Sequence, residues 1–186
     1  THPYPLVLVH GGGGQGTDWM TTPDGRPGRA RSLVEQGYAV YVVDRVGLGR
    51  SPYHPEVIGP MGGAFPYEAG RGLFAPDDVA DQQTAWPWER DPGTGEMDQL
   101  VAGMGPMPAD LGVSQELDAD RLVKLLDRIG PAVLVTHSAG GPVGWLVADA
   151  RPDLVKGIVA LEPMGPAFVE FPGLGTLTWG MTAAPI

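Results

Sequence analysis

Four short apolar runs recur along the chain, at residues 6–9, 39–43, 132–135 and 157–161. They are rich in β-branched residues and do not alternate with polar ones, which is typical of strands buried on both faces of a parallel sheet. Between them, apolar residues recur at helical spacing over residues 29–36, 115–129 and 139–150. This alternation of strands and helices predicts the α/β fold class.

The predicted helices carry signals at their ends. Gly37 follows the first helix, as glycine often does at a C-terminus. Ser114 is expected to cap the second helix, which Gly130 ends. Pro142 is tolerable in the first turn of the third helix.

Residues 52–113 interrupt this order with a long stretch rich in glycine, proline and methionine. A loop of this length inside a compact domain is usually functional, and its large apolar side chains favour a lid that walls an apolar pocket. We expect the tail at residues 165–186 to complete that wall. The side chains expected there are Phe65, Tyr67, Phe74, Trp86, Trp88, Met104 and Met107. The residues expected to bind substrate are Gly13, Trp86, Trp88 and Met104.

Composition narrows the function classes. The net charge of −10 argues against nucleic acid and anionic membrane surfaces as partners. The chain has no cysteine, which excludes thiolate metal sites, and its four histidines show no metal-ligand spacing. No apolar run reaches the length of a membrane span, and the chain begins without methionine, which indicates a processed or trimmed start. None of these features indicates the cellular compartment of the protein.

Ser138 is the first candidate for chemistry. It lies between the strand that ends near Val135 and the helix that follows, in the order Thr136-His137-Ser138-Ala139-Gly140. A nucleophile elbow needs a serine on a sharp turn with small neighbours. Gly140 satisfies this pattern, whereas Thr136 stands where the pattern has glycine. The alternative is a buried serine that merely ends a strand.

A run of glycines, Gly11 to Gly14, follows His10 and the first strand. Backbone N–H groups of these glycines could converge there on a developing oxyanion. The competing interpretation is a dinucleotide-binding fingerprint with Asp44 as the ribose ligand. Turn-forming residues at 17–28, where a helix should begin, count against it. We expect Asp44 to hold its turn by accepting backbone hydrogen bonds.

These motifs, in this order, resemble the α/β-hydrolase superfamily, and more closely the bacterial esterase family typified by Alcaligenes esterase 713. Further residues that carry the resemblance are Thr22-Pro23-Asp24-Gly25-Arg26, Gly37-Tyr38, Asp44 to Ser51, and Val159 to Pro163. It implies a three-layer fold with a mostly parallel sheet, incomplete in residues 1–186, with residues 52–113 as an insertion in a single domain. It also implies Ser138 as nucleophile, Glu162 as the triad acid, Gly12 (with Gly13 as the alternate) and Ala139 as oxyanion donors, and no cofactor.

The base is missing from this scheme. The superfamily places its catalytic histidine after the last of eight strands, whereas only four are recognisable here. Of the chain's histidines, His54 is the only conceivable substitute, because His10 is expected to brace the glycine turn and His137 adjoins the serine. We therefore expect a longer catalytic unit, truncated at its C-terminus and also at its N-terminus. The function expected is a serine esterase acting on a small apolar ester. Thioester, amide and C–C cleavage, a non-catalytic ligand-binding role and a homodimer stay open.

Overall fold

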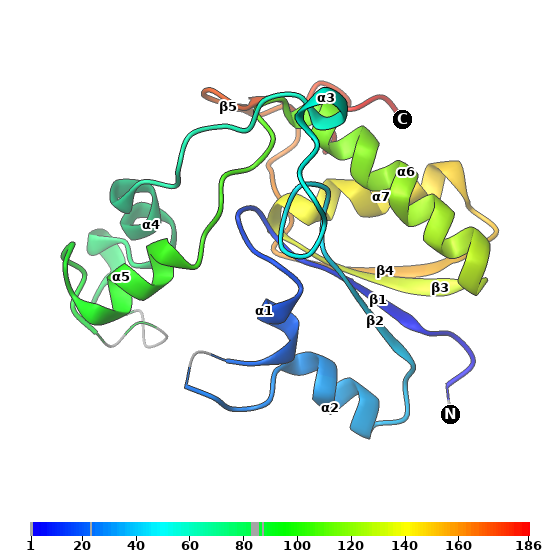
Figure 1. Cartoon of the computed structure of the whole chain (residues 1–186), viewed down its shortest axis with the longest axis horizontal. Coiled ribbons are helices and arrows are strands. Elements are labelled where there is room, and N and C mark those ends of the chain that lie inside the picture. Colours follow the sequence, from blue (N-terminus) through cyan, green and yellow to red (C-terminus); the bar gives the residue numbers. More distant parts are fainter. Residues whose placement is uncertain (1, 23, 83–85, 87) are drawn as a thin grey trace.

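The sheet of the computed structural model has four parallel strands in the order β2-β1-β3-β4 (Figure 1). The structure describes residues 2–22, 24–82, 86 and 88–186. All four predicted strands are confirmed, with ends that differ by no more than two residues: β1 (Leu6–Val9), β2 (Val40–Val43), β3 (Ala132–His137) and β4 (Val155–Leu161). Parallel pairing brings their carboxyl ends to one edge of the sheet.

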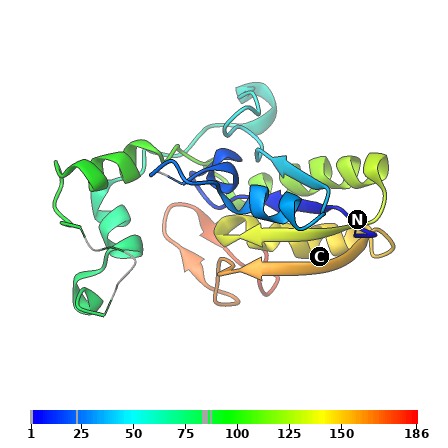
Figure 2. The ribbon, with the colours of Figure 1, turned by 90° about the horizontal axis from the view of Figure 1, so that it is seen from below.

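Helices cover both faces of this sheet, which gives three layers (Figures 1 and 2). On one face lie α1 (Thr17–Met20) and α2 (Arg29–Glu35), which bury Trp19 and Ala30 against the sheet. On the other lie α6 (Leu111–Ile129) and α7 (Gly141–Ala150). The expected α/β-hydrolase-like layering is therefore confirmed.

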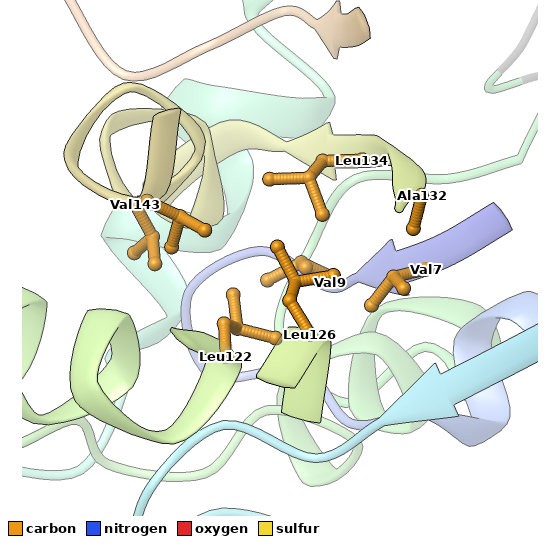
Figure 3. Packing of buried hydrophobic residues seen from close by; sticks show 8 residues of the cluster. Val7, Val9, Leu122, Leu126, Ala132, Leu134 and Val143 are labelled. Carbon is orange, nitrogen blue, oxygen red and sulfur yellow. The ribbon is translucent and has the colours of Figure 1, made fainter. Parts of the chain in front are cut away.

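The main hydrophobic core lies between the sheet and the helices α6 and α7 (Figure 3). Val7 and Val9 of β1 pack there with Leu126 of α6, and all three side chains are fully buried. Burying one such side chain contributes about 1.5–3 kcal/mol. The central strands β1 and β3 are thus buried as predicted. The outer strands β2 and β4 are only partly buried in the described residues, so the expectation of burial on both faces is wrong for them.

The helix cap predicted at Ser114 is wrong. Helix α6 begins earlier, and the carboxylate of Asp110 caps it by accepting the backbone N–H of Val113 at 2.8 Å. Ser114 is buried inside the helix, where its hydroxyl accepts a hydrogen bond from Arg45 at 3.4 Å. A residue far away in sequence therefore uses the side chain that local pattern assigned to the helix end.

The 52–113 segment folds into short helices beside the sheet: α3 (Pro55–Ile58), α4 (Tyr67–Phe74), the 3-10 helix η1 (Asp77–Val79) and α5 (Gly95–Ala102). In both views α4 and α5 stand away from the strands (Figures 1 and 2). The Tyr67 hydroxyl donates to Asp98 at 2.5 Å and joins these two helices. A small hairpin of β5 (Glu170–Phe171) and β6 (Gly175–Thr176) follows the sheet. None of the helices in the described part of the chain has the length and apolar character that a membrane span needs.

Candidate active site

Ser138 occupies a strained turn between β3 and α7. Its φ of 48° lies in the left-handed region, where a residue with a side chain costs about 1–3 kcal/mol. The turn is tight because its neighbours are small. A Cβ at Gly140 would lie 2.5 Å from the His10 carbonyl oxygen, and one at Gly141 would lie 2.6 Å from Pro163 Cβ. The half-buried Ser138 thus lies on the kind of sharp strand-to-helix turn that a nucleophile elbow requires.

Thr136 shows how the elbow tolerates a side chain where the usual pattern has glycine. The residue is fully buried, and its methyl group lies against Gly144 of α7, where a Cβ would come within 3.2 Å. Gly144 thus supplies the space that Thr136 takes up. The Thr136 hydroxyl has no hydrogen-bond partner among the described residues.

The glycine turn (residues 11–14) lies directly beside the elbow. A Cβ on Gly11 would be 3.0 Å from Ser138 Cβ, and one on Gly12 would be 3.3 Å from Ala139 Cβ. The Gly12 N–H donates no hydrogen bond within the described residues, and Ala139 lies in the first turn of the 3-10 helix η2 (Ser138–Gly140), whose N–H groups lack helical partners. Within the part of the chain that the structure describes, the N–H groups of Gly12 and Ala139 therefore lie beside the serine without a hydrogen-bond acceptor. Gly13 has a φ of 67°, in the left-handed region that favours glycine, and the chain changes direction there.

A buried network of hydrogen bonds and one ion pair holds the glycine turn in place. His10 Nδ1–H donates to the Gly11 carbonyl at 2.8 Å, and His10 Nε2 accepts the Arg45 backbone N–H at 3.0 Å. These two bonds fit the neutral imidazole, and burial lowers the pKa of His10. The Arg45 guanidinium also donates to Gly11 at 3.4 Å and pairs with Asp118 of α6 at 2.8 Å, with both side chains 3% exposed. The expected bracing role of His10 is confirmed.

Arg45 and Asp118 are the residues that sequence reasoning missed. Neither belongs to a recognisable motif, and they lie 73 residues apart. Asp118 was visible only as a polar residue within an amphipathic helix, and Arg45 only as the neighbour of Asp44. One signal in the sequence could have found them. Asp118 lies on the apolar face of α6, between Ser114 and Leu122, and a carboxylate on a buried face needs a cationic partner.

Asp44 holds its own turn, as expected. Its carboxylate accepts the Gly16 N–H at 2.6 Å and pairs with Arg50 at 2.5 Å. Burial alone would raise the pKa of Asp44, but the hydrogen bonds from Gly16 and Arg50 outweigh it and leave that pKa below its ordinary value. The carboxylate is thus occupied by loop groups. The short α1 that follows the glycine turn also differs from the long helix of a dinucleotide-binding unit.

Glu162 emerges next to the serine because of strand register. His137 of β3 pairs with Leu161 of β4, so Ser138 and Glu162 are the residues that follow each strand. Glu162 also has a left-handed φ, of 41°. The loop after it is tied to the elbow, since the Met164 N–H donates to the Ser138 carbonyl at 2.9 Å.

The Glu162 carboxylate is exposed and makes no hydrogen bond or ion pair with the described residues. Its negative charge lies close enough to His137 to affect the pKa of that imidazole. Burial lowers the pKa of His137, and the nearby Glu162 carboxylate opposes that shift.

Three of the four histidines, His2, His10 and His54, make contacts that direct their rings away from the serine hydroxyl, and His137 adjoins Ser138 in the chain. His2 stacks on Tyr38 with ring centroids 3.6 Å apart, and His54 lies exposed, 3.5 Å from the Glu56 carboxylate. Within the described residues no hydrogen bond joins any imidazole to Ser138 Oγ.

A cavity of about 650 Å³ opens over Ser138. Its wall includes Gly12, Gly13 and Ala139 from the strand ends, and Ser138 contributes the one polar side chain among the described lining residues. The 52–113 segment supplies Phe65, Leu73, Phe74, Met104 and Met107, and the tail supplies Phe171, Pro172 and Leu174. An uncharged wall of this kind fits an apolar ligand.

The cavity wall does not include Trp86, Trp88 or Tyr67. The two indole rings pack on each other in a T-shaped pair with centroids 5.4 Å apart, and Trp88 is 48% exposed. The structure therefore does not bring the predicted tryptophans to the cavity, whereas it does bring Met104 and Gly13. Aromatic side chains in the segment stabilise each other as well as the cavity, and their sequence alone does not separate the two roles.

A sequence profile of the α/β hydrolase fold matches residues 4–180. The chain belongs to the α/β-hydrolase family. Its fold is the one that the resemblance in the sequence implied, and the dinucleotide-binding interpretation is wrong.

Two relatives of this α/β-hydrolase add detail. A curated fungal protein, described as a probable secreted lipase phiG, is 40% identical over 200 residues, which cover 100% of this chain and 52% of that protein. The solved structure of a novel bacterial esterase superposes with a TM-score of 0.71 and 28% identity, over 88% of this chain and 54% of the other. The chain thus spans about half the length of both, and relatives come from fungi as well as bacteria.

Proposed function

We propose that the complete protein hydrolyses carboxylic esters of small apolar molecules, with Ser138 as the nucleophile. The observation that carries this proposal is the combination of a strained serine and an unpaired Gly12 N–H at the floor of an uncharged cavity. The strain is retained where it exposes the hydroxyl to a ligand, which is the usual reason for such strain at functional sites. The names of the two relatives, lipase and esterase, support the same class of reaction.

The reaction would begin with attack of Ser138 Oγ on the ester carbonyl carbon, which forms a tetrahedral intermediate. Its oxyanion would lie between the N–H groups of Gly12 and Ala139, and each such donor is worth about 10²–10³-fold in kcat. The Gly13 N–H is the alternate donor. The network of His10, Arg45 and Asp118 would hold the glycine turn in position before substrate binds.

A base must take the serine proton and then protonate the leaving alcohol. We propose that this base is a histidine outside these 186 residues. The contacts of His2, His10 and His54 direct their rings elsewhere, and within the described residues no hydrogen bond joins the His137 ring to Ser138 Oγ. Glu162 would orient the base. Its exposed, unpaired carboxylate beside the elbow suits a partner that arrives from another part of the protein. The 52–113 segment would act as the lid that walls the substrate.

Two other functions are compatible with part of this arrangement. Thioester or amide cleavage would use the same nucleophile and donors. A non-catalytic ligand-binding protein would use the cavity alone, but the strained serine favours catalysis.

The test is turnover by the complete protein. We expect Ser138→Ala to lower kcat/KM for p-nitrophenyl butyrate by roughly 10⁴–10⁶-fold while leaving thermal unfolding unchanged. Ser32→Ala, on the exposed face of α2, serves as the control and should keep wild-type turnover. Near-normal turnover in the Ser138→Ala protein would contradict the proposal.

A further inference from the structure

Met107 lies against the glycine turn at the point where the proposed oxyanion donors meet. A Cβ on Gly12 would be 2.6 Å from Met107 Sδ and 3.3 Å from Ala139 Cβ. The thioether is therefore in contact with the Gly12 backbone, and Ala139 borders the same small space. Met107 also lines the cavity. Its side chain thus borders the space in which a substrate carbonyl would have to sit.

The backbone around Met107 is fixed on both sides. Gly105 N–H donates to the Gly13 carbonyl at 2.7 Å, which ties this stretch to the glycine turn. Gly62 N–H donates to the Met107 carbonyl at 2.7 Å, and the adjoining Pro108 is buried and forms a β-bridge with Met61. The backbone of Met107 is therefore fixed by hydrogen bonds within the cavity wall, whereas the side chain of Leu73 in the same segment is exposed to solvent.

The position of this wall has a steric consequence for an ester. When the carbonyl oxygen lies between the N–H groups of Gly12 and Ala139, the carbon bonded to the carbonyl lies within one bond of the reacting centre. In an ester whose acyl group lies toward Met107, branches on that carbon would need the space beside Gly12 that the Met107 side chain fills. Crowding of this kind costs about 1–3 kcal/mol, which is roughly 10–200-fold in kcat/KM.

We propose that Met107 is a specificity-determining residue that selects acyl groups unbranched at the carbon next to the carbonyl. This inference rests on the proposed ester hydrolysis and adds to it the class of acid that the site accepts. Met104 makes a useful contrast. It lines the same cavity but lies against Gly13, where a Cβ would be 3.2 Å from Met104 Cε, so it borders the turn one residue farther along.

The experiment compares two substrates with the same leaving group, p-nitrophenyl butyrate and p-nitrophenyl pivalate, in the complete protein. Met107→Ala should raise the pivalate-to-butyrate ratio of kcat/KM by about tenfold or more. Met107→Leu, which keeps the bulk, should leave that ratio within about threefold. Met104→Ala should alter the butyrate rate without raising the ratio. Met107→Val removes less of the side chain and should raise the ratio by a smaller factor, which keeps the test open if Met107→Ala does not fold.

An unchanged ratio in Met107→Ala and Met107→Val, in a protein whose wild type hydrolyses butyrate, would overturn the role of Met107 and leave the proposed function standing. An equal rise in Met104→Ala would overturn it too, because the effect would then be general loosening of the cavity. Hydrolysis of neither ester by the wild type would instead overturn the proposed function.

Discussion

The two sides of the cavity over Ser138 are built in different ways. On one side, Ser138, Gly12 and Glu162 each follow a strand of the sheet, and register and buried contacts fix where they emerge. On the other side, the 52–113 segment offers short helices and loops with many exposed apolar side chains, such as Leu73 at 67% exposure. The comparison teaches that the proposed chemistry depends on the scaffold, whereas the shape of the bound ligand depends on the segment. Changes in the scaffold should therefore affect every substrate, and changes in the segment should affect some.

The largest effect on turnover from a supporting residue should come from Glu162. We predict that Glu162→Gln lowers kcat/KM for p-nitrophenyl butyrate by about 10²–10⁴-fold, because an amide neither orients nor stabilises a protonated histidine as a carboxylate does. Glu116→Gln, an exposed change on α6, is the control and should stay within twofold. Full activity in the Glu162→Gln protein would mean that another residue is the acid.

The buried ion pair under the glycine turn should carry the largest effect on stability. Asp118→Asn leaves the Arg45 guanidinium, 3% exposed, without its countercharge and should lower the free energy of unfolding by about 3–5 kcal/mol. Asp120→Asn on the same helix removes an exposed pair with Lys124 and should cost less than about 1 kcal/mol. Urea unfolding of the two variants measures the difference in the free energy of unfolding. Equal decreases in the two variants would contradict the prediction that the buried pair contributes more to stability than the exposed one.

The cavity wall gives a smaller and more selective effect. Phe74→Ala should lower kcat/KM for a long-chain ester such as p-nitrophenyl decanoate by about fivefold, which corresponds to about 1 kcal/mol of lost apolar contact. Trp88→Ala, outside the wall, should change it by less than twofold. If the tryptophan matters more than Phe74, the substrate extends beyond the cavity described above.

The smallest effect separates two buried threonines of the same exposure. Thr136→Val removes a hydroxyl that has no partner in the described residues and should raise the free energy of unfolding by about 1 kcal/mol. Thr182→Val removes a hydroxyl that donates to the Ala184 carbonyl at 2.8 Å and should lower it by about 1 kcal/mol. Shifts of the same sign in both variants would show that the hydroxyl contacts do not decide the outcome.

The sequence predicted the scaffold well because its signals are local. The β-branched runs at β1 and β3 mark buried strands, and a serine between a strand and a helix marks the elbow. The glycine turn was equally visible, since close backbone approach leaves glycine as the fitting residue.

What the sequence did not predict depends on contacts between distant residues. The Ser114 hydroxyl was expected at a helix end, but α6 begins at Leu111 and the buried hydroxyl accepts a hydrogen bond from Arg45, in the turn after β2. Trp86 and Trp88 were expected at the ligand, but they pack on each other. Met107 stood out only as one of several apolar residues until its contact with Gly12 singled it out.

The central claim is that Ser138 is an activated nucleophile, and covalent labelling tests it most directly. The complete protein is treated with a fluorophosphonate, and the adduct is located by peptide mass spectrometry. The account predicts one phosphonyl group per chain on Ser138, and none after Ser138→Ala. Absence of labelling, or a label on another serine that survives Ser138→Ala, would contradict it.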